Sequence, residues 1–183
     1  EVLAKTLVNA AGAWADGLAK IAGAKPLGIG PLRRTVVQLR TNPAPPAKLP
    51  LTLDINGRFY FKSGAGRVWL SPHDEVPTPP CDAAPEEIAV AQAIDRFEQV
   101  VDWSVESVET KWAGLRSFAP DRLPVFGQDP ANPAFFWFAG QGGYGIQTAP
   151  AAASIAAEQL LGRAGSTDVT NVDANLYSPA RFT

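Results

Sequence analysis

The sequence predicts an α+β fold that combines an antiparallel sheet with part of an α/β layer. Near the N-terminus, a β-like run at residues 3–9 is followed by small residues and a helical pattern, which is the order of an α/β unit. Short β-rich runs joined by tight turns then occupy residues 35–70, as in an antiparallel meander. With 46% hydrophobic and 19% charged residues among 183, the chain can bury a core of ordinary size.

The N-terminal α/β unit is predicted from a strand and a helix. After the run at 3–9, a helical pattern extends from Trp14 to Ala22 and is closed by Gly23. A turn at 28–31 leads to the β-rich run Thr35–Leu39.

The meander is predicted from its turns. Prolines make residues 42–50 a loop, because they lack the N–H donor and fix φ. Asn56-Gly57 separates the β-like runs Leu51–Ile55 and Arg58–Lys62, and this dipeptide between two such runs is a strong hairpin signal. Val68–Leu70 adds the next strand.

The second half predicts helices and buried strands. Pro85-Glu86-Glu87 opens a helix, since proline and acidic residues suit a helix N-terminus. The apolar face of this helix is assigned to Ile88, Ala91, Ile94 and Phe97. A strand is expected at Val105–Trp112, and the wholly apolar run Phe135–Ala139 predicts a strand buried on both faces. A last helix is expected from Ala149 to Leu161, with Pro150 at its start.

Composition and charge exclude several classes of function. The net charge of −2 comes without a basic stripe, so a nucleic-acid partner is not expected. No apolar run is long enough to span a bilayer, and no secretory signal opens the chain, so a cytoplasmic location is expected. Cys81 and His73 are the only residues of their types, so neither a metal site nor Ser-His or Cys-His hydrolysis is predicted, and His73 is assigned to an exposed loop. Because the chain contains no methionine, we expect a fragment or a processed product that lacks an N-terminal half.

A glycine-rich turn, Gly140–Gly145, connects the apolar strand to the last helix. It matches G-x-G-x-x-G, but no βαβ unit with an acidic residue about 20 positions later follows it, so a simple dinucleotide-binding fold is rejected. Glycines allow a ligand to approach the main chain, and a helix N-terminus favours negative charge. A tight turn that binds no ligand remains an alternative.

Two arginines and a tyrosine are candidate carboxylate ligands. Arg116 ends a strand next to aromatic residues, and arginine binds carboxylates through two parallel hydrogen bonds. Of the pair Arg33-Arg34, only one side chain faces inward, because side chains alternate along a strand. Tyr60 lies in the meander, and its alternative role is half-buried packing in the sheet. For the arginines, the alternative is a solvated position on the surface. Asp54 is either an acid near the hairpin or a turn residue.

Four motifs in order give the chain a family resemblance. They are LVNAAGAW at residues 7–14, PLRR at 31–34, WAGLRSF at 112–118 and QGGYGIQT at 141–148, with Phe59-Tyr60 between the second and third. Together they resemble the C-terminal half of FAD-dependent enzymes of the D-amino-acid oxidase superfamily, most of all its D-arginine/D-amino-acid dehydrogenase branch. The resemblance implies that residues 1–30 and 117–163 are part of an FAD-binding domain, that 31–116 form a substrate-binding domain, and that 164–183 are a C-terminal tail.

The resemblance also assigns roles to individual residues. Arg116 would hold the substrate carboxylate together with Tyr60 and Arg34, and the Gly143 carbonyl would accept a hydrogen bond from the substrate amine. The positions that would contact the substrate side chain are Leu51 and Leu53. The positions that would contact FAD are Ala11, Gly12, Trp14, Gly142, Gly143, Tyr144, Gly145, Ile146, Gln147 and Thr148. Val68 takes the place of a lysine that some oxidases of the superfamily hold over the flavin, which indicates a dehydrogenase.

The implied activity is oxidation of the C–N bond of a (D-)amino acid to an imino acid, which water hydrolyses to a 2-oxo acid and ammonia. A sarcosine- or glycine-type amine oxidase is one alternative. The other is a non-catalytic fragment, because the segment that holds the FAD pyrophosphate in this superfamily is not found in the sequence. The expected partners are an amino-acid substrate and the missing N-terminal half of the same protein, and the fragment alone is expected to be inactive.

Overall fold

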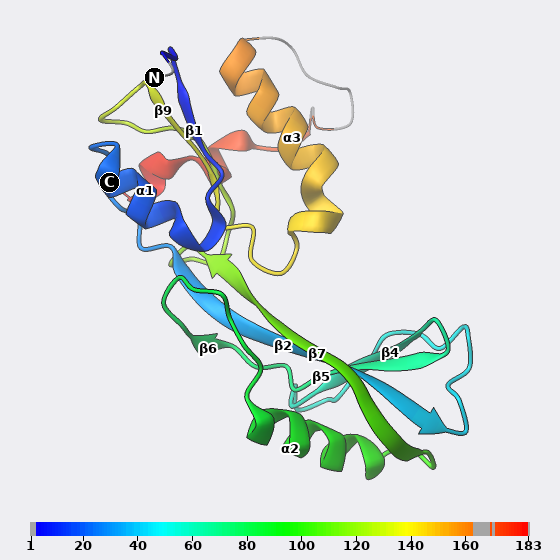
Figure 1. Cartoon of the computed structure of the whole chain (residues 1–183). Helices are drawn as coiled ribbons and strands as arrows, with labels where there is room; N and C mark the ends of the chain where they lie inside the picture. The colour runs from blue at the N-terminus through cyan, green and yellow to red at the C-terminus, as the bar shows by residue number, and fades with distance from the viewer. Residues whose placement is uncertain (1–2, 163–168, 170, 183) are drawn as a thin grey trace. The chain divides into compact units, whose positions relative to one another are not determined.

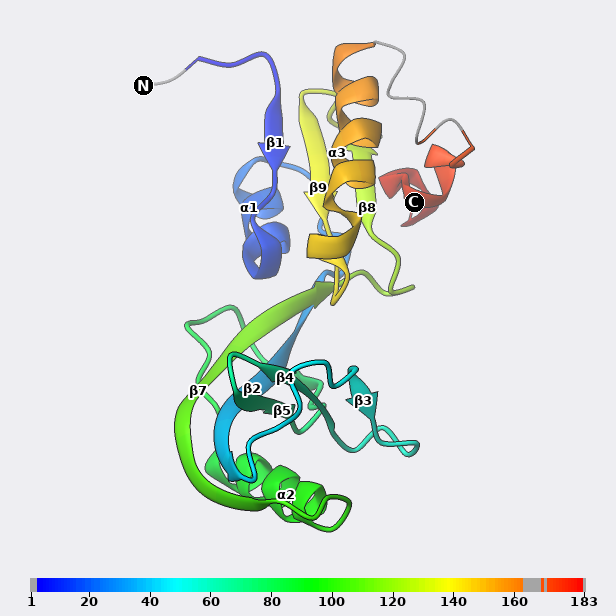
Figure 2. The ribbon, with the colours of Figure 1, turned by 90° about the vertical axis from the view of Figure 1, so that its right-hand side faces the viewer.

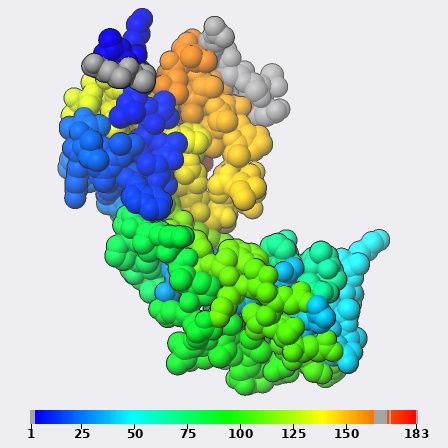
Figure 3. Space-filling view, viewed as in Figure 1, coloured from blue at the N-terminus to red at the C-terminus, as the bar shows by residue number. Residues whose placement is uncertain are grey.

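The computed structural model describes residues 3–162, 169 and 171–182, and these form two compact units. The first unit contains Glu1–Pro31 and Arg116–Thr183, and the second contains Leu32–Leu115. Figure 3 shows the first residues (blue) and those of the last helix (yellow to orange) in one body, although they are far apart in the sequence. The predicted α+β class is confirmed. That one unit binds FAD and the other substrate remains a prediction.

The first unit is built on a three-stranded sheet, with strand order β1-β9-β8 (Figure 2). β1 (Leu7–Asn9) runs parallel to β9 (Phe135–Ala139), and β8 (Val125–Gln128) runs antiparallel to β9. As its composition predicts, β9 is buried, with Trp137 fully enclosed and its Nε1 donating to Oδ2 of Asp129 at 3.0 Å. β8 escaped prediction because its four residues include Gly127 and Gln128, which break the apolar pattern.

Helices flank this sheet. The turn η1 (Gly12–Trp14) leads into α1 (Ala15–Ile21), whose Ala15 and Ala19 pack into the core with β9. α3 (Gly145–Leu161) packs against β8. α3 begins four residues before the predicted start at Ala149, so Pro150 lies inside the helix rather than at its beginning. The helix starts as soon as the glycine turn ends. The apolar periodicity begins later in the sequence and could not indicate this early start.

The C-terminal residues, which the sequence assigns to a tail, contain regular structure. Two short 3-10 helices, η3 (Ala174–Tyr177) and η4 (Pro179–Phe182), pack against β8. The ring of Tyr177 lies 5.6 Å from that of Phe126, measured between centroids. Isolated aromatic contacts of this kind have no periodicity, which is why the sequence pattern did not indicate these two helices. Part of the predicted segment, residues 163–168, 170 and 183, falls outside the described residues.

The second unit is an antiparallel sheet with strand order β3-β4-β5-β2-β6, and β7 pairs with β2 as well. The strands are β2 (Gly30–Asn42), β3 (Thr52–Leu53), β4 (Tyr60–Gly64), β5 (Arg67–Ser71), β6 (Val76–Pro77) and β7 (Ser104–Phe118). The predicted meander is therefore confirmed. Its hairpin closes through a hydrogen bond from the Asp54 N–H to the Phe59 carbonyl, at 3.0 Å.

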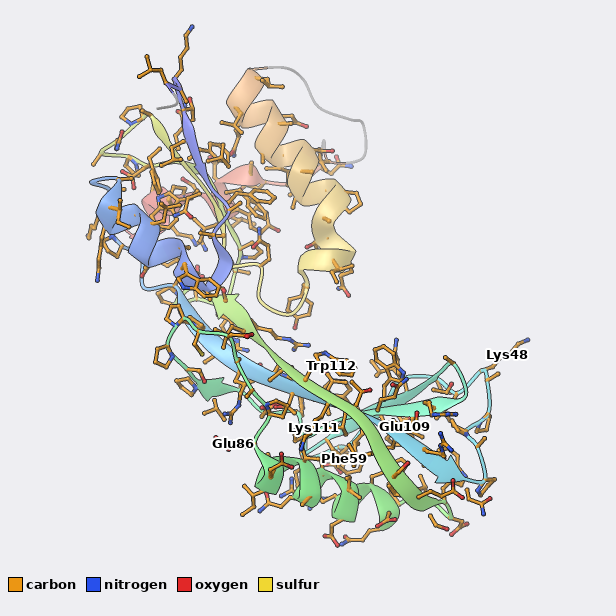
Figure 4. All side chains as sticks on the ribbon, in the orientation of Figure 1. Lys48, Phe59, Glu86, Glu109, Lys111 and Trp112 are labelled. Carbon is orange, nitrogen blue, oxygen red and sulfur yellow. The ribbon has the colours of Figure 1, made fainter. Side chains whose placement is uncertain are left out.

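One face of this sheet is covered by α2 (Glu87–Glu98), as Figure 1 shows. The buried side chains of the helix are Val90, Ala93 and Phe97, whereas Ile88 is 68% exposed. The prediction was therefore right for Phe97 and wrong for Ile88 and Ala91, since the helix carries two overlapping apolar stripes and packing selects one. On the sheet side this core contains Val37, Leu39, Phe59, Phe61, Val68 and Leu70, and Phe59 is labelled in Figure 4.

No helix in the described ranges is long and apolar enough to cross a membrane.

An ion pair attaches the C-terminal 3-10 helix to the loop before β8. Arg181 contacts Asp121 through Nε at 2.6 Å and Nη2 at 3.2 Å, and Nη2 also donates to the Leu123 and Pro124 carbonyls at 3.0 Å. The hydrogen bond from Arg181, more than any other contact, holds the pKa of the Asp121 carboxyl below its ordinary value. A carboxyl with a lowered pKa stabilises the fold above its ordinary pKa, and this contribution is lost as the pH falls through the lowered value.

Asp121→Asn should therefore lower the melting temperature near pH 7 and have little effect at a pH below the lowered pKa of the Asp121 carboxyl. The loss should stay under about 1 kcal/mol because the pair is solvent-screened. Thermal unfolding of both proteins at several pH values would measure this. An equal loss at every pH would show that the ion pair is not its cause.

Candidate functional site

The glycine turn is tied to the end of β7. It connects β9 to α3, and Gly140 and Gly142 have φ angles of +71° and +56°, which glycine adopts without strain. The Gly142 N–H donates to the Ser117 carbonyl at 2.8 Å, and Phe118 forms an antiparallel bridge with Gln141. The structure thus joins two predicted motifs that lie more than twenty residues apart in the sequence.

Two positions in this turn have no room for a side chain. A Cβ at position 142 would lie 2.4 Å from Cε1 of Phe118, and one at position 143 would lie 2.8 Å from Nη1 of Arg116. Both distances are below normal contact, so the aromatic ring and the guanidinium rest directly on the glycine main chain. Arg116 therefore lies beside the glycine turn, within the first unit.

The turn ends at the N-terminus of α3. Tyr144 is the residue before the helix, and it caps α3 with no side-chain hydrogen bond. The first turn of α3 contains no acidic residue, so the positive end of the helix dipole is not neutralised within that turn. Tyr144 is 59% exposed and Ile146 is 96% exposed. Apolar and aromatic surface thus surrounds a helix end that favours negative charge.

A second turn with a left-handed glycine follows β1. Asn9 is fully buried, and its Nδ2 donates to the Ala15 carbonyl at 2.9 Å while its Oδ1 accepts from the Ala11 N–H at 3.3 Å. These bonds fix the turn at Ala11 and Gly12, where Gly12 has a φ of +55°. Trp14 is half exposed. Sequence analysis did not single out Asn9, although a polar residue at the end of an apolar strand was the available signal.

The second unit separates the two neighbouring arginines. Arg33 lies on the side of α2, where its Nη2 is 2.8 Å from Glu86 Oε1, at the start of the helix. Arg34 lies on the other face of the sheet, which we call the distal face because it is opposite α2. There its Cζ is 5.9 Å from the centroid of the Tyr60 ring. The expectation that the pair would divide between two faces is thus met, with Arg34 and Tyr60 together.

His73 and Glu75 are members of this cluster that sequence analysis missed. His73 was assigned to the surface, but its Nδ1 is 2.8 Å from the Gly57 carbonyl and its ring meets that of Tyr60 edge-on at 5.4 Å. Glu75 pairs with Arg34, with 2.9 Å between Oε1 and Nη2. The loop holding both residues has no periodic pattern, so only their charge or ring chemistry could have marked them.

Other predicted positions are placed as follows. Leu51 and Leu53 are 65% and 57% exposed, and Leu53 is the strand partner of Tyr60. Asp54 accepts the Arg58 N–H at 3.0 Å, and hydrogen bonding from the Arg58 side chain lowers the pKa of its carboxyl, so Asp54 is a turn residue. Val68 is fully buried against α2, so the expectation that it lies over a flavin is wrong.

Val68 does not lie on the distal face, and an aromatic pair occupies that face beside it. Trp69, the next residue on β5, meets Trp112 of β7 edge-on at 5.3 Å, and Trp112 is labelled in Figure 4. Lys62 places its Nζ 5.5 Å from the centroid of the Trp69 ring, which is within cation–π range. Since Val68 points to the core, the inference it suggested about dehydrogenase chemistry loses its basis. Within the described ranges, no three His, Cys, Asp or Glu side chains are grouped to hold a metal ion.

Comparison with known proteins identifies the family. Residues 1–159 match the family described as "DAO: FAD dependent oxidoreductase". Among curated proteins, the chain is 27% identical to bovine (Bos taurus) FAD-dependent oxidoreductase domain-containing protein 1 and 26% identical to its mouse (Mus musculus) counterpart, over 96% and 85% of its own length. It covers only 39% and 35% of these relatives, so it spans well under half of their length.

Solved structures share the fold. L-Proline dehydrogenase from P. horikoshii superimposes with a TM-score of 0.76 and 24% identity, covering 97% of this chain and 46% of that one. Glycine oxidase from Geobacillus kaustophilus gives 0.72 and 24%, covering 91% and 44%. Iminodiacetate oxidase from Chelativorans sp. BNC1 gives 0.74 and 19%, covering 97% and 47%. Because the family match extends over most of the sequence, the chain belongs to the DAO family of FAD-dependent oxidoreductases.

Proposed function

We propose that this chain contributes to an enzyme that oxidises the C–N bond of a (D-)amino acid to an imino acid, which water then hydrolyses to a 2-oxo acid and ammonia. The observation that carries the proposal is the Arg116 guanidinium, which rests on the main chain of Gly143 at the start of α3. A carboxylate-binding side chain thereby lies beside a turn that lets a flat ring approach the backbone. The similar structures named glycine oxidase and L-proline dehydrogenase support amino acids as the substrate class.

The residues present fit the flavin of such an enzyme. Positions 142 and 143 of the turn Gly142–Gly145 carry no side chains. Because Phe118 and Arg116 fill the space on their Cβ side, a flat ring would approach the main chain from another side. The N-terminus of α3, with residues up to Thr148, would stabilise negative charge on the ring, and Ala11 and Gly12 offer a second glycine turn within the same unit. FAD, when bound, accepts the hydride of the substrate Cα–H, and with it both electrons of the oxidation.

The side chains of this chain would position the substrate. Arg116 binds the carboxylate through two hydrogen bonds, with Tyr60 and Arg34 as further donors to it. The Gly143 carbonyl accepts a hydrogen bond from the substrate amine. An amine that arrives neutral needs no protein base to lose a proton, so these residues act by orientation and charge stabilisation. The apolar side chains of Leu51 and Leu53 would contact the substrate side chain.

A secondary amine is the second candidate substrate. It corresponds to the sarcosine- or glycine-type alternative, and the names of L-proline dehydrogenase and iminodiacetate oxidase favour it. A substrate panel of D-amino acids, glycine, sarcosine and proline, assayed with the flavin-loaded protein, separates the two. A visible spectrum without flavin bands, for protein reconstituted with FAD, would instead favour a non-catalytic role.

In the intact enzyme to which this chain contributes, Arg116→Ala should raise KM by a factor corresponding to about 2–5 kcal/mol, because the substrate carboxylate loses its charged partner. Arg116→Lys should recover only part of this, since a lysine cannot make the two parallel bonds. Steady-state kinetics with the best substrate of the panel would measure both. An unchanged KM in Arg116→Ala would reject the assignment of the carboxylate to this residue.

Two neighbouring glycines form a matched pair of tests. Gly143→Ala should move the Arg116 guanidinium, the far end of a flexible side chain, at a stability cost within about 0.5 kcal/mol, while KM rises. Gly142→Ala forces a left-handed φ on alanine and a clash with the Phe118 ring, so it should lose about 2 kcal/mol or more of unfolding free energy. Urea denaturation and kinetics on both variants test this. Equal stability losses would contradict the described geometry.

A further inference from the structure

Arg34 is a buried cation, and some of the N–H donors of its guanidinium have no hydrogen-bond partner in the described part of the chain. Its side chain is only 5% exposed, and one of its nitrogens, Nη2, contacts Oε1 of Glu75 at 2.9 Å. Nε and Nη1 have no hydrogen-bond partner among the residues that the structure describes. A buried guanidinium is costly unless its charge is balanced and its N–H groups are bonded. Glu75 supplies the charge. The remaining donors are enclosed, and an anionic ligand group that displaced the surrounding side chains would supply the acceptors that they lack.

The loop that presents Glu75 is held from two sides. Asp74 accepts both the Thr35 N–H, at 2.7 Å, and the Thr35 hydroxyl, at 2.8 Å. His73 adopts a φ of +57°, unusual for a residue with a side chain, and contacts the Gly57 carbonyl through Nδ1. Glu75 follows directly and reaches Arg34 on the distal face. Since its neighbours are anchored on two other segments, the Glu75 carboxylate is placed by the fold.

The carboxylate changes which ligands the arginine can accept. Arg34 and Glu75 together have no net charge, so a ligand with one carboxylate and one amine meets a donor and a negative group, complementary to its own charges. A ligand with a second carboxylate meets repulsion from Glu75, whose side chain is 34% exposed, so solvent and salt weaken this repulsion without removing it at short range. The pair should therefore favour ligands with one carboxylate over ligands with two.

We propose that Glu75 is a positioning residue that holds Arg34 on the distal face and makes this site favour singly charged over doubly charged carboxylates. The inference rests on the role proposed for Arg34 in binding the substrate carboxylate. It deepens that role by naming the residue that sets the charge class of the substrate: amino acids without an acidic side chain.

The plain alternative is a salt bridge that only fastens the loop to β2. If the salt bridge has only this structural role, its loss should weaken the binding of every ligand in proportion to the lost stability, whatever the charge of the ligand. Glu75→Gln keeps a hydrogen-bond acceptor of the same shape and removes the charge, so it separates the two interpretations.

The experiment titrates the 183-residue chain with acetate and with malonate at constant ionic strength. Binding is followed by the backbone amide shifts of the residues around position 34 in ¹⁵N-edited spectra, a readout that the variants of Arg34 and Glu75 also provide. In Glu75→Gln, the affinity for malonate relative to acetate should rise about tenfold over the wild type, as expected for the loss of one nearby negative charge. Glu75→Asp should keep the wild-type ratio.

A matched control removes the same charge elsewhere in the unit. Glu109 pairs with Arg40 and Arg67, with Oε1 and Oε2 each 2.5 Å from a guanidinium nitrogen, and it is labelled in Figure 4. Glu109→Gln should leave the ratio unchanged, because Arg40 lies six residues from Arg34 along β2, about 20 Å at the rise of a strand. A tenfold rise in this variant too would mean that total charge is responsible, and would overturn the proposal.

The remaining outcomes also decide it. If Arg34→Gln abolishes binding but Glu75→Gln leaves the ratio unchanged, Arg34 keeps its proposed role and the role of Glu75 is rejected. If Arg34→Gln leaves both titrations unchanged, or neither probe binds the wild type, Arg34 is not a carboxylate ligand and both claims fail.

Discussion

The site depends on a contact that only glycine permits. Main-chain atoms of Gly142 and Gly143 lie against the Phe118 ring and the Arg116 guanidinium. A Cβ at position 142 would clash with the ring, whereas one at position 143 would displace the flexible end of Arg116. The backbone bond from Gly142 to Ser117 holds the same two segments together. The end of β7 and the start of α3 are therefore held in fixed positions relative to each other. Any ligand that approaches the glycine turn also approaches the arginine, which is why a cofactor ring and a substrate carboxylate can be proposed for the same place.

Strand alternation imposes a second constraint, on charge. Arg33 and Arg34 are identical in composition and adjacent in sequence, yet β2 turns one to Glu86 at the start of α2 and the other to Tyr60 and Glu75. Each buried guanidinium thus has its own carboxylate partner. Exchanging their roles would require the whole strand to slip by one residue, which would also move Val37 and Leu39 out of the core. The hydrophobic pattern of β2 therefore fixes which arginine lies on the side of α2 and which lies on the distal face.

The sequence predicted what depends on local chemistry and missed what depends on packing. The Asn56-Gly57 hairpin and the apolar β9 followed from turn propensity and composition, and both are present. The buried stripe of α2 was misassigned because the choice between two apolar faces is made by the sheet beneath it. Val68 was aligned by sequence position alone, and its alternation on β5 directs it to the core.

The residues missed at the candidate site have a common feature: their partners lie far away in the sequence. Glu75 meets Arg34 forty-one positions away, and Asp74 meets Thr35 at a separation of thirty-nine. No periodicity links such pairs, so a motif search finds the arginine and overlooks the acid that forms an ion pair with it. Sequence motifs mark the cation proposed to bind a carboxylate, whereas the acid that pairs with it, Glu75, is found only in the folded chain, and the charge class proposed for the ligand rests on that pair.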